Sequence, residues 1–520
     1  MKLHILFLLA SLVILGAACP FSALVTPTNP VIPAIATLTP AITATSIPTT
    51  SQTSAAATVA PQTMTNGPYL VFLRDQGNGQ EFVLMDADGK GEVAFPFPMN
   101  SYVNMPRSLS DLVSPDGIWL AYYTGSAGQS FGQVGTDTAD LTLNLMSLGI
   151  TSPAGSTKVV SRLLSADYPA NFTRAAQELG PSDNTAQSLQ DTFVYGITQS
   201  IAWSPDGLHL AFAGQMDGLS TDLYIYNDAY GTIQQLSSGP EEVLWIEWSP
   251  DGKWILDGSS YFVGEGMSYN IYATSLDGKV VHHLLEDSGL ADGLTWINAH
   301  EFLAYQSQNG PGNFGLERVD IESGNVDKIW DGSFRSMAVD PTGNWLAFQA
   351  VQEVQAAETG LFLVNLATLE STKVQVPDPT PDYWIRQGIL SMSNGSERAF
   401  LIRDYADQGM YYLSTSGVLT PIGTSADLFS VSPNQLDWIA IKDNIQLFPA
   451  GGSQTRTFNL PAGTKRGDFA RIVWRPDSSG IFLVSNNRQL YALDFSSGNS
   501  TLVEQSLYTA GPEGLIWIRK

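Results

Sequence analysis

Short apolar runs broken by polar turns recur along most of this chain. The same arrangement appears in VSPDGIWLAYYTG at 113–125, WSPDGLHLAFAG at 203–214 and WSPDGKWILDGSS at 248–260. Apolar and polar residues alternate after each turn, and a period of two is typical of a half-buried strand. The pattern therefore predicts paired β-strands that are joined by a Ser-Pro-Asp-Gly turn.

More diverged copies of this arrangement occur further along the chain. They are WINAHEFLAYQS at 296–307, VDPTGNWLAFQA at 339–350, MSNGSERAFLIR at 392–403, VSPNQLDWIAIK at 431–442 and WRPDSSGIFLVS at 474–485. Pro205 and Pro250 lie 45 residues apart, and Pro433 and Pro476 lie 43 residues apart. A repeat of about 45 residues that holds four short strands is typical of one propeller blade.

The two ends of the repeat region complement each other. The unit at 69–97 begins at what should be its second strand, whereas LIWIR at 515–519 is a first strand with nothing after it. Pairing them would hide a sheet edge. We predict an all-β fold, a single β-propeller of four-stranded blades, eight or nine in number, closed by pairing of the C-terminal strand with the N-terminal blade. If there are eight, the weak units near 296 or 392 are the ones in doubt.

The turn and the residue before it have physical roles. Proline presets φ at the second turn position, aspartate accepts backbone hydrogen bonds, and glycine closes the turn at little steric cost. Trp203 and Trp248 stand directly before two of these turns. We expect both side chains to fill space between neighbouring blades rather than to stack on a ligand.

The repeat also resembles a known family. An apolar strand, SPDG, LAF, an LYxxN-type strand and a final turn succeed one another between Trp203 and Gly231. This order is similar to the TolB-like, WD-repeat-like propeller repeats of bacterial envelope proteins, and the similarity extends over nearly everything after Pro68. The resemblance implies the fold and leaves the function open, because this repeat occurs in both binding scaffolds and enzymes.

The N-terminus has the features of a secretory signal. Lys2 precedes an apolar run from Leu3 to Leu15, and small residues lead into Cys19. The segment resembles the lipobox of bacterial lipoproteins, which implies a signal peptide at 1–18 and lipid attachment at Cys19. The departures are Gly16, where a leucine is usual, and Pro20. The alternative is an ordinary signal peptide that is cleaved after Ala18.

A linker comes after the cysteine. Residues 20–67 contain no Asp, Glu, Lys or Arg and are rich in Thr, Ala, Pro and Ser. Such composition predicts a disordered tether at 19–67, anchored by the lipid on Cys19, ahead of a propeller at 68–520. Within the propeller, the segment at about 165–197 contains helix formers and no blade pattern, so we predict a partly helical insertion there.

Charge and cysteine content limit the partners. The 520 residues carry 25 Lys plus Arg against 50 Asp plus Glu, a formal net charge of -25. Such a surface repels phosphate backbones, which argues against nucleic acid. The single cysteine excludes an intrachain disulfide. The fold must therefore be stabilised by packing.

The two ends of the predicted propeller differ. Antiparallel strands place the first-to-second and third-to-fourth turns at one end, where the sequence has short, stereotyped turns. The other end receives the loops at 125–139, 215–221, 259–268, 308–315 and 351–359, together with the insertion. Variable loops on a rigid scaffold usually carry binding sites, so we place the function at the loop end.

Two stretches match motifs of catalytic or metal sites, but both matches are weak. Gly128-Gln-Ser-Phe-Gly132 fits a nucleophile elbow only formally, because it lies in a Gly/Ser loop and not between a strand and a helix. Asp86-Ala-Asp-Gly-Lys-Gly-Glu92 has calcium-loop spacing in part but falls at a third blade turn and lacks the distal glutamate. We assign no catalytic residue, no metal ligand and no cofactor. A structural calcium ion in an acidic channel stays an open alternative.

These observations predict a monomeric, membrane-tethered binding or scaffold propeller. It would be extracytoplasmic, with its lipid as the sole membrane contact, and would recognise an envelope or extracellular protein or a glycan through its loop end. The alternative is a glycan hydrolase or lyase that uses two carboxylates at the mouth of the channel. A carboxylate pair some 5 to 10 Å apart in a pocket at the loop end would favour the enzyme.

Overall fold

The structure is a computed structural model. It describes residues 67–76, 80–89, 91–96, 101–102, 109–125, 141–149, 154–167, 197, 200–218, 220–263, 266–285, 293–306, 315–351, 359–377, 385–392, 398–404, 409–449, 454–508 and 514–518. The signal peptide, Cys19, the tether up to residue 66 and the Gly128–Gly132 motif lie outside these ranges, as does most of the insertion at 165–197. Our expectations for those segments remain predictions.

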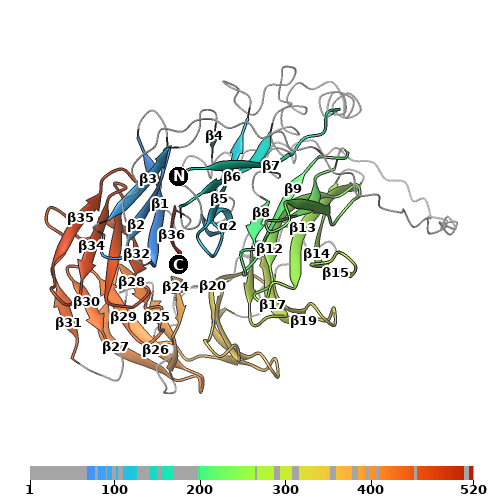
Figure 1. Cartoon of the computed structure of the whole chain (residues 1–520). Helices are drawn as coiled ribbons and strands as arrows, with labels where there is room; N and C mark the ends of the chain where they lie inside the picture. Colours follow the sequence, from blue (N-terminus) through green and yellow to red (C-terminus); the bar gives the residue numbers. More distant parts are fainter. Residues whose placement is uncertain are drawn as a thin grey trace, which may run out of the picture. The chain divides into compact units, whose positions relative to one another are not determined.

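Nine four-stranded antiparallel sheets make up the described part of the chain, and they are arranged as the blades of a β-propeller (Figure 1). The nine-blade alternative is therefore confirmed. The weak units near 296 and 392 both form complete sheets. We number the blades 1 to 9 in chain order.

The first three blades contain the N-terminal strands and the C-terminal one. Blade 1 consists of β36 (Leu515–Ile518), β1 (Tyr69–Asp75), β2 (Gln80–Asp86) and β3 (Glu92–Pro96). Blade 2 consists of β4 (Ser101–Tyr102), β5 (Trp119–Thr124), β6 (Thr142–Ser147) and β7 (Thr157–Arg162), with α2 (Leu109–Leu112) between its first two strands. Blade 3 consists of β8 (Ile201–Trp203), β9 (His209–Gly214), β10 (Asp222–Asn227) and β11 (Thr232–Gln235).

The next three blades keep the same order without a crossover. Blade 4 consists of β12 (Glu242–Trp248), β13 (Trp254–Val263), β14 (Gly266–Ser275) and β15 (Val281–Leu285). Blade 5 consists of β16 (Gly293–Trp296), β17 (Glu301–Gln306), β18 (Gly315–Asp320) and β19 (Val326–Asp331). Blade 6 consists of β20 (Phe334–Val339), β21 (Trp345–Ala350), β22 (Gly360–Asn365) and β23 (Ser371–Lys373).

The last three blades bring the chain back to its start. Blade 7 consists of β24 (Ile385–Ser391), β25 (Arg398–Asp404), β26 (Gly409–Ser414) and β27 (Leu419–Ser425). Blade 8 consists of β28 (Leu428–Val431), β29 (Trp438–Ile441), β30 (Ile445–Phe448) and β31 (Arg456–Phe458). Blade 9 consists of β32 (Phe469–Trp474), β33 (Gly480–Ser485), β34 (Leu490–Asp494) and β35 (Ser500–Glu504).

The C-terminal strand closes the fold. β36 pairs antiparallel with β1 (Figure 1). In this pairing, Leu70 lies opposite Trp517. On β1, Leu70 and Phe72 belong to a hydrophobic cluster with Phe482 of blade 9, whereas the intervening Val71 faces a cluster shared with blade 2. Alternate residues of one strand therefore seal the two sides of one blade, as a period of two requires.

First strands of neighbouring blades contact one another, as β8 and β12, β20 and β24, and β28 and β32 do. They form the inner side of the propeller. Fourth strands such as β11 and β23 are exposed along their whole length. A feature that is lined by first strands therefore faces the centre of the propeller.

The Ser-Pro-Asp-Gly turn is built by its own side chains. Ser204 Oγ donates to Asp206 Oδ1 at 2.6 Å and accepts from the amide of His209 at 2.9 Å. Asp206 Oδ1 also accepts from the amide of Leu208, and Gly207 has a φ of 72°. The turns that start at Ser114 and Ser249 repeat this pattern. Since it recurs with the same local bonds, this turn serves the fold.

Both tryptophans before these turns lie between blades, as the sequence predicts. Trp203 is 5% exposed, and its Nε1 donates to the carbonyl of Leu112 in blade 2 at 3.1 Å. Trp248 is 6% exposed and donates in the same way to Ala202 in blade 3 at 3.0 Å. Each indole therefore packs an interface and satisfies its N–H there.

Two local expectations are wrong. The first strand of blade 2 does not run into Val113, which forms only an isolated bridge with Leu120. Instead, the single turn α2 buries Leu109 and Leu112, because residues three apart share a helix face. The segment 259–268 is also not an irregular loop, since β13 and β14 continue pairing up to Val263 opposite Gly266.

Candidate functional site

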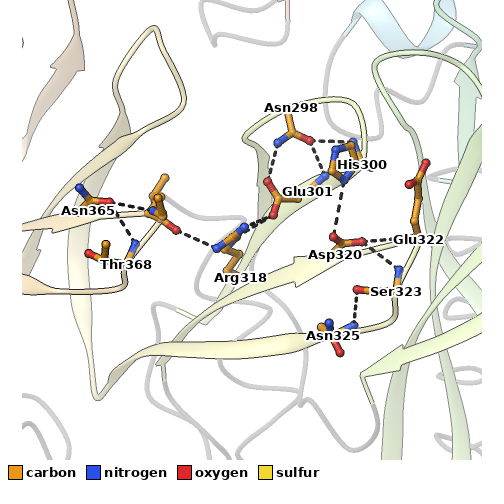
Figure 2. A network of polar contacts seen from close by, with 12 residues as sticks. Asn298, His300, Glu301, Arg318, Asp320, Glu322, Ser323, Asn325, Asn365 and Thr368 are labelled. Carbon is orange, nitrogen blue, oxygen red and sulfur yellow. Dashed lines mark hydrogen bonds and ion pairs between the residues drawn. The ribbon is translucent and has the colours of Figure 1, made fainter.

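The turn end of the propeller is occupied by structural contacts. Figure 2 shows one polar network there, at the ends of blades 5 and 6. Arg318 donates from Nε to Glu301 at 2.9 Å and from Nη1 to the carbonyl of Leu366, in the next blade, at 2.8 Å. Asn298 and Asp320 hold the adjoining turns through their side-chain oxygens. The network ties two blades together.

The motif at 86–92 is likewise a turn. The amide of Asp86 donates to the carbonyl of Gly91 at 2.8 Å, and that of Gly89 donates to the carbonyl of Asp86 at 2.8 Å. These bonds make it the third turn of blade 1, as we expect from its position. Across the described residues, no group of three or more His, Cys, Asp or Glu side chains could hold a metal ion.

A cavity opens at the loop end, where blades 7, 8 and 9 meet. Its volume is about 350 Å³, within the range of small-ligand pockets. It is lined by Leu390, Arg403, Asp427, Leu428, Phe429, Ile441, Gly467, Phe469 and Ala470. Most of these residues belong to β24, β28 and β32, which are first strands. The cavity therefore faces the centre of the propeller.

Arg403 is the cation in the lining of this cavity. It is half-buried at the end of β25, and its Nη1 donates to the carbonyls of Ala426 and Asp427. Its guanidinium carbon lies 5.4 Å from the centre of the Phe429 ring. Burial lowers the pKa of Arg403 although the charge of Asp427 opposes this. The guanidinium stays charged, because arginine is not deprotonated in proteins.

Asp427 is the acid of the lining, and it is already paired. Its carboxylate binds Arg466 through both oxygens, at 2.5 Å from Nε and 2.8 Å from Nη2. This contact holds the pKa of Asp427 below its usual value, and the charges of Lys442 and Arg403 lower it further. Arg466 is therefore the direct partner of this carboxylate, and Arg403 and Lys442 add positive charge nearby.

A second group at the loop end is acidic and lies on blades 3 and 4. Gln235 Nε2 donates to Asp217 at 2.7 Å and reaches Asp222 at 3.5 Å, so one amide bridges both carboxylates. Burial raises the pKa of Asp222 to about 7, and the charge of Asp217 and a hydrogen bond with it contribute. Asp222 is buried, and Tyr224 donates its hydroxyl to Asp217 at 2.7 Å.

This acidic pair bears on the enzyme alternative. Glycan hydrolases separate their two carboxylates by about 5 Å or more, so that sugar or water fits between them. Here the side-chain amide of Gln235 lies within 2.7 Å of Asp217 and 3.5 Å of Asp222, so a protein group already contacts both carboxylates. Glu242, which accepts from the amide of Thr221 at 2.7 Å, also has a pKa raised by burial. The acids of this group are therefore bonded to neighbouring groups of their own loops.

Sequence reasoning placed the function at the loop end but did not locate this cavity. No motif distinguishes Arg403 from other arginines at strand ends. Asp427 and Phe469 lie 24 and 66 residues further along the chain. No local signal connects them. Cys19, the one site residue that the sequence nominates, lies outside the described residues. No helix among the described segments has the length and apolarity that a membrane span needs.

The chain matches no family model and no curated protein sequence. Among solved structures it is similar to a eukaryotic initiation factor, with 11% identity over 87% of this chain and 99% of that chain and a TM-score of 0.47. It is also similar to an oligogalacturonate lyase in complex with manganese, with 11% identity over 81% and 95% of the two chains and a TM-score of 0.34.

A further similar structure is dipeptidyl peptidase 4 of Porphyromonas gingivalis, with 17% identity over 59% of this chain and 53% of that chain and a TM-score of 0.40. Identity this low transfers no activity to this chain. The function of this protein must therefore be inferred from the residues of the propeller itself.

Proposed function

We propose that this protein is a lipid-anchored, extracytoplasmic binding propeller that captures an envelope or extracellular protein or a glycan at its loop end. The TolB-like character of its repeats and its non-catalytic nature belong to the same proposal. The tether at 19–67 would carry the propeller away from the membrane.

One observation carries the proposal, the cavity that is lined by Arg403 at the loop end. Ligand sites are mostly apolar hollows with a few polar groups that fix orientation. Six of the nine lining residues are apolar, namely Leu390, Leu428, Phe429, Ile441, Phe469 and Ala470, and the charged ones are Arg403 and Asp427. At the turn end, by contrast, polar side chains such as Arg318 and Asp320 are used by the fold.

The enzyme alternative has less support. Hydrolysis of a glycan needs an acid and a second carboxylate on opposite sides of the scissile bond. Asp222 and Glu242, whose pKa values are raised, are bound to neighbouring loop groups at blades 3 and 4 and are not part of the cavity lining. We therefore keep binding as the proposed function.

The anchor can be tested separately from the binding. In the full-length protein, Cys19→Ser should abolish labelling by a radioactive fatty acid and move the protein from the membrane fraction to the soluble fraction. Wild-type protein that carries no label would disprove the lipid anchor. A labelled Cys19→Ser variant would show that the lipid is attached at another residue.

The binding end can be tested with a pair of matched variants. Arg403→Gln removes a charge at the loop end, and Lys253→Gln removes one at the turn end, where Lys253 is 73% exposed. Full-length protein on a support should retain a solubilised envelope protein or a glycan fragment, and so should Lys253→Gln. Arg403→Gln should lose it. Retention that depends on Lys253 and not on Arg403 would refute the proposal.

A further inference from the structure

Arg403 has hydrogen-bond donors left over. Among the described residues, its side-chain hydrogen bonds are the two from Nη1 to backbone carbonyls. Nε and Nη2 together form one flat edge of the guanidinium, whose two N–H groups match the two oxygens of a carboxylate. That edge belongs to a residue that lines the cavity. An arginine in this state can bind an anion by donating two parallel hydrogen bonds to it.

The local charge favours an anion. Arg403, Arg466 and Lys442 all act on Asp427, and Arg466 binds it through both oxygens. Three cations therefore act on this one carboxylate, and Asp443 acts in turn on Arg466, in a protein whose formal net charge is -25. An acidic surface repels anions in general, so a place where several cations gather selects where an anion can be held.

The remaining walls suit an apolar body. Phe429 lies beneath the Arg403 guanidinium at 5.4 Å, and Leu390 and Phe469 also line the cavity. Contact with such side chains favours a ligand that has an apolar or ring face beside its charge. A volume of about 350 Å³ is at the small end of ligand pockets, which limits the occupant to a small group.

We infer that this cavity binds the carboxylate of a small organic acid, held on the Nε–Nη2 edge of Arg403, with the body of the ligand against Phe429 and Phe469. The inference rests on the proposed binding function and names the chemical class that the site accepts. The acid can be free or the terminal group of a larger molecule.

Calorimetric titration of full-length wild-type protein with paired probes tests this. One arm compares glucuronate with glucose, and the other compares N-acetyl-leucine with its amide. At least one acid should bind with a Kd below about 1 mM, and its uncharged partner should bind at least about tenfold more weakly. The arm that responds identifies a sugar acid or an amino-acid carboxylate as the source.

Other outcomes overturn the inference. No carboxylate-dependent heat up to about 10 mM would do so. Inorganic phosphate, which is not planar and has no apolar body, should bind at least about tenfold more weakly than the better acid. Phosphate that binds as tightly as that acid would exclude a site selective for carboxylates.

Variants then place the ligand. Arg403→Lys keeps the charge but lacks the planar edge, so it should lower the affinity for the acid by at least about tenfold. Lys253→Gln should leave that affinity unchanged. Equal affinity in Arg403→Lys would contradict the role of the edge. If Arg403→Lys does not fold, as judged by its melting temperature, the comparison of acid and uncharged partner on wild-type protein decides.

The two proposals can fail independently. If the loop end retains envelope material in an Arg403-dependent way and no organic acid binds, the binding function stands and the ligand class is wrong. If an acid binds and nothing from the envelope is retained, the pocket is a small-molecule site and the capture function is wrong.

Discussion

Closure by the C-terminal strand makes a quantitative prediction at Leu515. This side chain is 1% exposed and belongs to the cluster that joins blades 9 and 1, with Phe72 and Phe482. Leu515→Ala removes its packing and leaves a cavity. Leu502→Ala is the matched control, because Leu502 is 41% exposed on the outermost strand of blade 9.

The two substitutions should differ severalfold in how much they lower the free energy of unfolding. Truncation of a fully buried leucine typically lowers the free energy of unfolding by about 2–5 kcal/mol, and we expect about 3 kcal/mol for Leu515→Ala because its surroundings come from two blades. Surface substitutions usually stay within about 0.5 kcal/mol, so Leu502→Ala should lie near that limit. The gap between them should therefore be at least about 2 kcal/mol.

Urea denaturation of the full-length protein measures this difference. The 12 tryptophans supply a fluorescence signal, and Trp517 lies on β36 itself, where its Nε1 donates to the carbonyl of Trp474 at 2.8 Å. Truncation after Gly514 should go further and expose the edge of β1, which promotes self-association detectable by light scattering. Truncation after Ile518 should not.

Equal destabilisation by Leu515→Ala and Leu502→Ala would refute this account of closure. So would a truncation after Gly514 that stays monomeric with an unchanged urea midpoint. Either result would mean that β36 adds little to the sheet of blade 1.

Three further predictions concern single side chains. Gln435 occupies the usual glycine position of a diverged turn with a φ of 60°, so Gln435→Gly should raise the free energy of unfolding by about 0.5–1 kcal/mol in urea. Because the pKa of Asp222 is raised to about 7 in the folded state, its proton is held more tightly there than in the unfolded chain, whose aspartate pKa is about 3.9. The free energy of unfolding should therefore fall as pH rises from about 4 to about 7, and Asp222→Asn should flatten that slope in urea titrations at several pH values. Lys158 lies 4.2 Å from the centre of the Trp119 ring, so Lys158→Met should lower the melting temperature and cost about 1 kcal/mol, whereas Lys279→Met should change nothing measurable.

Local sequence signals were sufficient to predict the blade and its turn. Ser204, Pro205, Asp206 and Gly207 form their hydrogen bonds within six residues, so a short stretch of sequence contains all that the turn requires. The approximate 45-residue repeat then predicted the sheets, and the unmatched strands at the two ends predicted how the fold closes. Even the diverged turn at Gln435, which has no glycine, has the positive φ of the Ser-Pro-Asp-Gly turns.

Where a local signal was missing, the prediction was wrong or incomplete. Nothing before Val113 marks the turn of helix that buries Leu109 and Leu112, because that turn is stabilised by packing and not by its own propensity. The segment at 259–268 contains glycines and serines typical of loops, yet pairing with the opposite strand extends β13 and β14 through it. Tertiary contacts decided the conformation of both segments.

The sequence by itself determined the architecture of this protein, because blades repeat and each repeat is specified by residues close together in the chain. It also determined which end of the propeller has individual loops. Only the tertiary structure decided that Arg403, Asp427 and Phe469 share a cavity, since they come from three consecutive blades. The physical reason is that each blade is specified by residues close together in the chain, whereas this cavity forms where separate blades converge.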